Sequence, residues 1–565
     1  MTGLRNFSGL VVIVVVLVCL GCSVDAQSGS WQLLLGNAGI SSMHTAVTRY
    51  DTAIMLDRTN IGASQISLAN GLCRNQPLER LLKVDCSAHS VMFDPLTNTV
   101  RPLFILTDTW CSSGAFMADG RLVQTGGDFE GRKKIRTLVP CAPGGSCDWV
   151  EDNSTELTIG RWYASNHILP DGQRQIVVGG AGAPSYEFVP KRTPTEGKFD
   201  LPLLMPGKDN LYPYITILPD GNLWIFAARD SCLLNYNTGV ILRNYPTMPG
   251  QTRNYPAAGS MTLLPLSYEN GFQIAEVLIC GGSSGSMNKG KPAQKSCGRM
   301  VVTDTAPTWA MEDMPVARTM GDMVLLPDGK VLIINGAQVG SQGWGYASQP
   351  AFQPCLYATN DPANRFQLLA PTTIARVYHS TANLLTDGRV LLAGSNTHQY
   401  YTFNDTPFPT ELRVEAFSPP YLSLNYLAQK PVLTFWPKKM TYGRDYFVSF
   451  LSLGRGLKKN DFVVECNLNS APFVTHTYSM GQRQIKLKTV LFGGRGGNQG
   501  GDQRGGRGNN QWDNQRGGGK WGKSSVSTVL VSSPPNSYVA PSQYYMLFVV
   551  VNGIPGKAQW VRISP

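Results

Sequence analysis

The chain has 565 residues, of which 42% are hydrophobic, and a formal net charge of +11 at pH 7. Beyond the first 26 residues, no stretch reaches the roughly 18 uninterrupted apolar residues that a membrane helix needs, so the sequence excludes a helical membrane protein. The excess of basic residues favours binding to acidic polysaccharide surfaces and carries no information about the fold.

Residues 1–26 are expected to be a signal peptide. Arg5 precedes an apolar run at residues 10–22, and the small residues Val24 and Ala26 fit a signal-peptidase site. This run is too short to anchor the chain in a bilayer. We therefore expect a secreted, extracellular protein of the cell wall or apoplast.

Ten cysteines remain after this leader, because Cys19 and Cys22 lie within it. In an oxidising compartment, disulfides are the default expectation for cysteine. Asn153 and Asn404 stand in acceptor sequons for N-glycosylation. Three cysteine pairs are close enough in sequence to form local disulfides: Cys73 with Cys86, Cys141 with Cys147, and Cys280 with Cys297.

A repeated Asp-Gly motif runs through the first two thirds of the chain. Each copy is typical of two strands joined by a tight turn, since Asp-Gly supplies the positive φ angles that such turns need. The copies recur about every 49 to 59 residues, which matches the blades of kelch-like propellers. The turn aspartates are Asp119, Asp171, Asp220, Asp328 and Asp387, with a degenerate copy at residues 269–271.

We therefore predict an all-β protein in which residues 27–411 form a kelch-like β-propeller. Seven blades follow if residues 42–56 close the ring by pairing with the last blade, and six is the alternative count.

The Asp-Gly repeat stops near residue 412, and alternating strand patterns continue to the end of the chain. Residues 412–565 are predicted to form an Ig-like β-sandwich domain. Within it, residues 493–523 include 13 glycines among 31 residues, and we expect a flexible surface insertion there.

Counting back eight residues from each turn aspartate defines one register of the repeat. If the strand that enters the turn is the innermost one, this register faces the central axis, and residues far apart in sequence converge there. A disulfide, a rim aromatic or a polar pair at a strand start would be the ordinary role of each residue taken singly. The register holds Cys111, Tyr163, Tyr212, Met320 and His379, with Tyr378 directly before His379.

One geometric condition applies to Tyr378 and His379. Adjacent residues in a regular strand point to opposite faces. The two side chains can therefore share a ligand only if the backbone twists as it leaves the preceding loop.

Four segments, TWCSSG, RWYAS, RVYHS and VTHTYSMGQRQIKL, occur in this order. With them, nearly the whole mature chain resembles the copper radical oxidases of the glyoxal oxidase and galactose oxidase family, most closely the plant-type glyoxal oxidases. The resemblance implies oxidation of a small, glyoxal-like aldehyde to a carboxylic acid, with reduction of dioxygen to hydrogen peroxide. It also implies a thioether cross-link between Cys111 and Tyr163 that carries a tyrosyl radical, and one copper ion bound by Tyr163, Tyr378, His379 and His476.

These residue types suit copper chemistry. Imidazole and phenolate ligands are typical of Cu(II), whereas zinc favours tetrahedral sets of cysteine and histidine. A free tyrosine has a pKa of about 10, so only a strongly polarising ion binds it as phenolate at neutral pH. Copper moves one electron at a time, and the cross-linked tyrosine would be the second redox store. By the same resemblance, Tyr378 accepts the substrate proton.

The chain departs from the galactose oxidase pattern at residues 181–183. Ala-Gly-Ala stands there in place of a tryptophan expected to stack on the cross-linked tyrosine. This difference favours small aldehydes, while a primary-alcohol oxidase acting on cell-wall sugars stays open. So does a non-catalytic kelch binding module.

The remaining expectations concern partners and the other histidines. RGG motifs in the glycine-rich segment are typical of nucleic-acid binding, but the signal peptide argues against it. We expect a monomer with no nucleic-acid or membrane partner. Four further histidines are interpreted as structural: His44, His89, His167 and His398.

Overall fold

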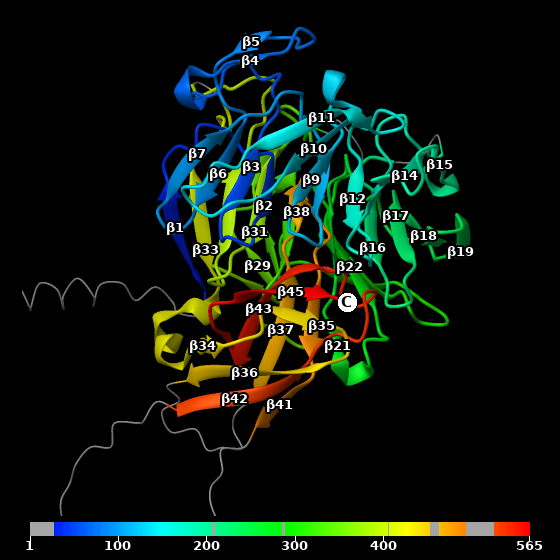
Figure 1. Ribbon diagram of the computed structural model, residues 1–565, viewed down its shortest axis with the longest axis vertical. Helices are drawn as coiled ribbons and strands as arrows, with labels where there is room; N and C mark the ends of the chain where they lie inside the picture. Colours follow the sequence, from blue (N-terminus) through cyan, green and yellow to red (C-terminus); the bar gives the residue numbers. More distant parts are fainter. Residues whose placement is uncertain (1–27, 206–209, 285–288, 405, 453–462, 493–524) are drawn as a thin grey trace, which may run out of the picture.

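The computed structural model describes residues 28–205, 210–284, 289–404, 406–452, 463–492 and 525–565 (Figure 1). The expected signal peptide and the whole glycine-rich insertion at residues 493–523 lie outside these residues. Strands dominate, joined by loops and a few short 3-10 helices. Among the described residues, no helix is both long and apolar enough to cross a membrane. The prediction of an all-β protein is confirmed.

The N-terminal part contains seven groups of four antiparallel strands, counted over the described residues. In six groups the strands pair in chain order. The first three comprise β2 (His44–Val47), β3 (Ala53–Leu56), β6 (Ser90–Asp94) and β7 (Thr99–Leu103); β8 (Ser113–Phe116), β9 (Leu122–Thr125), β10 (Lys134–Leu138) and β11 (Trp149–Glu156); and β12 (Ser165–Ile168), β13 (Gln175–Val178), β14 (Ser185–Val189) and β15 (Phe199–Asp200).

The next three groups repeat this order, and the seventh recruits the N-terminal strand. They comprise β16 (Tyr214–Ile217), β17 (Leu223–Ala227), β18 (Asp230–Asn235) and β19 (Val240–Asn244); β20 (Ser260–Leu263), β22 (Glu276–Cys280), β23 (Ser296–Val301) and β24 (Ala310–Asp313); β25 (Asp322–Leu325), β26 (Val331–Ile334), β29 (Cys355–Tyr357) and β30 (Phe366–Leu368); and β31 (Ser380–Leu384), β32 (Val390–Gly394), β33 (Val414–Ser418) and β1 (Ser30–Leu35). Two short hairpins lie outside the groups: β4 (Arg74–Asn75) with β5 (Val84–Asp85), and β27 (Ala337–Val339) with β28 (Ser348–Pro350).

The strand that joins the N-terminus to the last group is β1, which pairs with β33. The prediction that residues 42–56 make this pairing is wrong, because they form β2 and β3, which pair with each other. Every residue of β2 and β3 is buried, as inner strands require, whereas only one of the six residues of β1 is buried, which suits an outer edge. Because β33 begins at residue 414, the last group extends past the expected boundary at 411.

The five Asp-Gly turns each join the first two strands of a group, as predicted. Only the glycine takes a positive φ, for example +89° at Gly120, and the aspartate does not. Instead, the aspartate side chain accepts a hydrogen bond from the N–H two residues later, as Asp119 does from Arg121 at 3.0 Å. This Asx-type bond stabilises the turn locally, which explains why aspartate recurs there.

A buried arginine precedes the first strand of several groups and ties it to the second strand of the same group. Arg161 donates to the Gly179 carbonyl at 2.7 Å, and Arg376 donates to the Gly394 carbonyl at 2.8 Å. Buried main-chain carbonyls need partners, and here the guanidinium supplies them. Arg253 and Arg318 donate to main-chain carbonyls in their own groups in the same way.

The C-terminal part contains two sheets. The four-stranded sheet consists of β34 (Val432–Phe435), β36 (Asp445–Ser452), β42 (Ser525–Ser532) and β41 (Thr489–Phe492). The larger sheet consists of β21 (Leu266–Ser267), β40 (Gln484–Leu487), β37 (Val464–Ser470), β43 (Gln543–Val551), β45 (Gln559–Ser564) and β35 (Lys439–Thr441), with β44 (Ile554–Pro555) paired to β43. Since β21 precedes β22 in the chain, this sheet spans both parts.

One hairpin of the C-terminal part enters the N-terminal part. It consists of β38 (Phe473–Thr475) and β39 (Tyr478–Met480), and β38 pairs with β2 through Val474 opposite Thr45. Figure 1 shows β38 among the strands of the N-terminal groups, above the two C-terminal sheets. The hairpin therefore carries its turn residues into the centre of the N-terminal part.

All three local disulfides expected from the sequence are present: Cys73–Cys86, Cys141–Cys147 and Cys280–Cys297. The unpaired cysteines among the described residues are all buried: Cys111, Cys232, Cys355 and Cys466.

Candidate metal centre

Five side chains named from the sequence lie together: Cys111, Tyr163, Tyr378, His379 and His476. The Cys111 sulfur is 3.2 Å from His476 Nε2, although the two residues are 365 positions apart. One donor atom from each of Cys111, His379 and His476 lies within 4.8 Å of the others. The rings of Tyr163 and Tyr378 are 5.8 and 5.7 Å from that of His476. All five residues are buried.

The shared register has a conformational basis. Each register residue has a positive φ one or two residues before the first strand of its group begins, which is rare for residues other than glycine. The φ angles are +53° at Cys111, +66° at Tyr163, +44° at Tyr212, +58° at Met320 and +64° at His379, and Ala258 takes +55° at the start of the fifth group.

This conformation meets the geometric condition on Tyr378 and His379. The left-handed twist at His379 breaks the alternation of a regular strand, and the two rings stack with centroids 3.8 Å apart. Both side chains therefore face the same centre.

Main-chain hydrogen bonds link neighbouring register residues around this centre. The Tyr163 N–H donates to the Cys111 carbonyl at 3.0 Å, and the Tyr212 N–H donates to the Tyr163 carbonyl at 2.8 Å. The Met320 N–H donates in the same way to the Ala258 carbonyl at 2.8 Å. At these three junctions, one group thus helps to fix where the next presents its side chain.

His476 reaches the centre on the turn of the β38–β39 hairpin. His476 and Thr477 take φ values of +46° and +70°, the signs that a two-residue hairpin turn requires. A β-branched residue in this region is strained, and the Thr477 hydroxyl donates to the Gly259 carbonyl at 2.7 Å. His476 Nδ1 lies 2.6 Å from the Thr475 hydroxyl, which leaves Nε2 facing the cluster.

The electrostatics of the cluster favour neutral side chains. Burial, followed by the neighbouring His476, holds the pKa of His379 well below its ordinary value, and burial with His44 does the same for His476. Burial raises the pKa of Cys111, Tyr163 and Tyr378 well above their ordinary values. The imidazoles therefore keep free lone pairs, while the phenols ionise only beside a strongly polarising cation.

Sequence reasoning missed Tyr255, which lies between the two phenols. Its hydroxyl is 3.0 Å from that of Tyr163 and 3.2 Å from that of Tyr378. Its ring is 4.4 Å from the Tyr163 ring. The fifth group lacks an Asp-Gly turn, so no register could be counted there, although the aromatic residue in RNYPAAG before β20 was a usable signal.

The other register residues also border the cluster. The ring of Tyr212 is 5.0 Å from that of His476, and its hydroxyl donates to the Ser112 carbonyl at 3.0 Å. Met320 packs in one buried cluster with Tyr378. Residues 181–183 supply no aromatic ring, but Trp162 lies against Tyr163 with ring centroids 4.6 Å apart.

Each of the other four histidines has a hydrogen-bonded neighbour within the fold. His44 Nε2 lies 3.0 Å from the Thr109 carbonyl, and its ring is 6.3 Å from that of His476. His89 lies 2.7 Å from Asp85, and His167 lies 2.6 Å from the Ile168 carbonyl. His398 lies 3.1 Å from the Phe408 carbonyl.

The cluster fits a copper ion. It combines imidazole nitrogens with phenol oxygens, which is a donor set that copper accepts. His379 Nε2 is buried and has no hydrogen-bond partner in the described chain, so this nitrogen is free to bind a metal. Burial raises the pKa of Cys111 and the Tyr163 side chain lowers it, so the thiol and the phenol lie next to each other.

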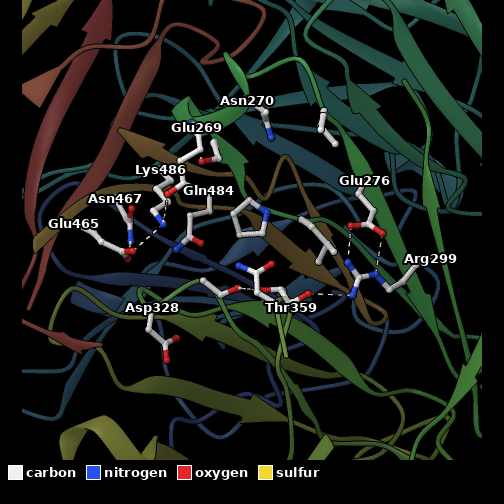
Figure 2. Close-up of a pocket in the computed structure, with 16 residues that line it drawn as sticks. Glu269, Asn270, Glu276, Arg299, Asp328, Thr359, Glu465, Asn467, Gln484 and Lys486 are labelled. Atoms are coloured by element: carbon white, nitrogen blue, oxygen red, sulfur yellow. Dashed lines mark hydrogen bonds and ion pairs between the residues drawn. The ribbon is translucent and has the colours of Figure 1, made fainter. Parts of the chain in front are cut away.

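A separate polar pocket of about 300 Å³ lies between the two parts of the chain (Figure 2). None of the five cluster residues lines it. Lys486 pairs there with Glu269 and Glu465, and Arg299 pairs with Glu276. Its basic groups are thus already compensated by protein carboxylates.

Two family models match the chain. The glyoxal oxidase N-terminus model matches residues 43–421, and the model of the galactose oxidase-like Early set domain matches residues 430–563. These matches confirm the resemblance that the four sequence segments indicate, and they give the C-terminal part its fold type.

Curated relatives cover nearly the whole chain. Aldehyde oxidase GLOX of Vitis pseudoreticulata is 47% identical over 95% of this chain and 97% of its own length. Aldehyde oxidase GLOX1 of Arabidopsis thaliana is 38% identical over 95% of this chain and 84% of its own. A galactose oxidase of Gibberella zeae is 23% identical over 84% of this chain and 64% of its own.

Among solved structures, a fungal alcohol oxidase of the AA5 family in complex with copper superimposes with a TM-score of 0.69. The alignment has 18% sequence identity and covers 95% of this chain and all of that one. At this identity, the match shows that the two chains share a fold.

Proposed function

Because the chain belongs to the glyoxal oxidase family, we propose that it is a copper radical oxidase. It oxidises small aldehydes to carboxylic acids and reduces dioxygen to hydrogen peroxide. The observation that carries this proposal is the convergence of Cys111, Tyr163, Tyr378, His379 and His476 at one buried point.

We assign each residue of the cluster a separate role. His379 and His476 would hold copper through Nε2, with Tyr163 and Tyr378 as oxygen ligands, and Cys111 would be joined to Tyr163 by a thioether. Copper, when bound, supplies one-electron redox chemistry. Tyr378 accepts the proton of the hydrated aldehyde, because it is the phenol without a cross-linking partner. Tyr255 lies within hydrogen-bond distance of both phenol oxygens and holds them in position.

Burial also protects the site from water. Tyr163 and Tyr378 are only 5% and 2% exposed, and half-buried aromatic side chains, including Trp162 and Tyr255, pack beside them. Such packing limits water near the reacting atoms and strengthens electrostatic interactions there.

The same proposal extends to architecture and location. The seven four-stranded groups would be the blades of one kelch-like propeller, followed by the sandwich domain. The leader sequence and the sequons support a secreted glycoprotein of the cell wall, which we propose is a monomer, and the charge of +11 supports contact with acidic polysaccharide.

The deciding experiment measures hydrogen peroxide release by copper-loaded protein across a panel of small aldehydes and primary alcohols. We expect one copper ion per chain and faster turnover of aldehydes. The variant His476→Ala serves as the control and should lose both copper and turnover. Copper binding without peroxide from any substrate would favour a non-catalytic binding module, and preferential turnover of alcohols would favour a galactose-type oxidase.

A further inference from the structure

Arg58 is a buried arginine that follows β3, next to the candidate metal centre. Its side chain is stacked rather than paired: the guanidinium carbon is 4.6 Å from the ring of Trp110 and 5.2 Å from that of Trp344. These two indoles stack on each other with centroids 5.5 Å apart and planes 14° apart. The residue is only 2% exposed.

The guanidinium of Arg58 donates no hydrogen bond to any residue that the structure describes, and its Nε and Nη2 are buried without a partner. Asp57 and Asp108 lie near enough for their charges to interact with that of Arg58, but their oxygens form hydrogen bonds with other residues. Asp57 accepts from the Tyr401 hydroxyl at 2.6 Å, and Asp108 accepts from the Asn60 amide at 3.1 Å. Leaving buried charged donors unpaired is costly, and the other buried arginines of the repeat avoid it by donating to carbonyls.

Further unpaired donors lie beside Arg58. The indole nitrogens of Trp110, Trp162 and Trp344 are each buried without a partner within the described chain. The ring of Trp162 is 5.1 Å from that of Trp110 and 4.6 Å from that of Tyr163, so the donors extend to the cluster. Such a group of donors is complementary to a ligand rich in acceptor oxygens.

Arg58 also lies next to the metal centre. Trp110, whose ring is 4.6 Å from the Arg58 guanidinium carbon, directly precedes Cys111 in the chain. The guanidinium is therefore separated from the cluster by little more than one indole ring.

We propose that Arg58, which packs beside the stacked pair Trp110 and Trp344, binds the carboxylate of a small anionic aldehyde of the glyoxylate type, with the aldehyde carbon facing Tyr163 and Tyr378. A guanidinium presents parallel N–H groups that match the two oxygens of a carboxylate. This inference rests on the proposed function and deepens it, since it names a substrate class and the residue that selects it.

The first test needs no turnover. Full-length copper-free protein is titrated with glyoxylate, and with glycolaldehyde as a neutral aldehyde of similar size, while tryptophan fluorescence is recorded. We expect glyoxylate to bind about 10- to 100-fold more tightly, and Arg58→Gln to remove this preference. Equal binding of the two ligands by the unmutated chain would overturn the proposal, and this comparison holds even if Arg58→Gln fails to fold.

Arg132 offers a matched control. It also lies over an indole, with its guanidinium carbon 5.8 Å from the Trp162 ring, but it is half exposed and paired with Asp128 at 2.6 Å. Arg132→Gln should leave the preference for glyoxylate intact. Loss of the preference in this variant as well would show that general positive charge, and not Arg58, is responsible.

The second test uses copper-loaded protein. Arg58→Gln should raise KM for glyoxylate about 10- to 100-fold and leave KM for glycolaldehyde unchanged, and Arg58→Lys should restore part of the loss. An equal rise of both KM values would contradict a carboxylate site. If no aldehyde yields peroxide, the proposed function fails, while the fluorescence titration still decides the role of Arg58.

Discussion

The Cys111 thiol has no disulfide partner, and it lies within hydrogen-bond reach of both Tyr163 and His476. An unpaired buried cysteine is ordinarily an inert apolar side chain. Placed beside a phenol and two imidazoles, it instead has the neighbours that a cross-linked cofactor needs.

We predict that Cys111→Ser nearly abolishes turnover and leaves copper bound, because the four proposed copper ligands stay in place while the proposed thioether cannot form. Peroxide assays and copper analysis check this, and the mass of the intact protein reports whether the cross-link forms. Cys232→Ser, at a buried free cysteine in β18, should retain activity. Full activity of Cys111→Ser would show that turnover does not require a cross-link between Cys111 and Tyr163.

A second prediction concerns His44. Burial lowers its pKa from 6.5 to about 3, so below pH 6.5 the unfolded chain binds a proton that the folded chain does not. The contribution of His44 to the free energy of unfolding is thus complete above pH 6.5. It is lost by up to about 1.4 kcal/mol per pH unit as the pH falls towards 3. Urea unfolding of copper-free His44→Asn should show a flatter pH dependence than the unmutated chain, and identical slopes would contradict this prediction.

At this scale, counting from the turns found Cys111, Tyr163 and His379, because the repeat keeps a constant spacing between turn and register. Counting from the turns did not find Tyr255 and Arg58, for a physical reason. They lie in loops whose paths are set by tertiary packing, and no periodicity reports where a loop side chain points.

At the scale of strands and turns, the residues with positive φ that precede the first strand of a group bring neighbouring groups into close contact. Gly281, at the end of β22, takes a φ of +69°, and a Cβ there would lie 2.2 Å from the Arg318 carbonyl oxygen of the next group. Glycine at this position therefore allows one group to pack on the next.

We predict that Gly281→Ala destabilises the protein by about 3 kcal/mol or more, because it combines backbone strain with a clash against main-chain atoms. Gly553→Ala is the matched control, since Gly553 has a φ of +78° but nothing within 4 Å of the added Cβ. It should cost about 1 kcal/mol. Urea unfolding of both variants measures the difference, and equal losses would show that the close approach contributes nothing.

The turns were predictable because the Asp-Gly sequence encodes them locally. The pairing of β1 with the last group was not predictable in this way. β1 and β33 pair across most of the chain, and the sequence SWQLLL carries no Asp-Gly signal. The continuous apolar pattern of β2 and β3 predicts buried strands, but it does not predict which strands they pair with.

For the molecule as a whole, the central fact is that His476 comes from the C-terminal part while the other four cluster residues come from the N-terminal part. Hydrogen bonds reinforce this connection, as Asn467 donates to the Pro327 carbonyl at 2.9 Å and Gln482 donates to the Met323 carbonyl at 3.0 Å. A metal ion in the cluster would therefore hold the two parts together.

We accordingly predict that copper raises the melting temperature of a single cooperative transition that includes both parts. Binding to the folded state alone adds about 4 kcal/mol at a free copper concentration about 1,000 times Kd. Scanning calorimetry with and without copper, and after removal of copper by a chelator, measures the shift. His476→Ala should abolish it, and separate melting of the two parts with only one of them shifted would contradict the prediction.

The position of His476 on the β38–β39 hairpin also sets an order of events during synthesis. Translation proceeds from the N-terminus, so a growing polypeptide that has not yet reached this hairpin possesses both phenols and one imidazole but lacks the last ligand. The candidate metal centre is consequently completed only late in translation, and unfinished chains lack one of its five residues.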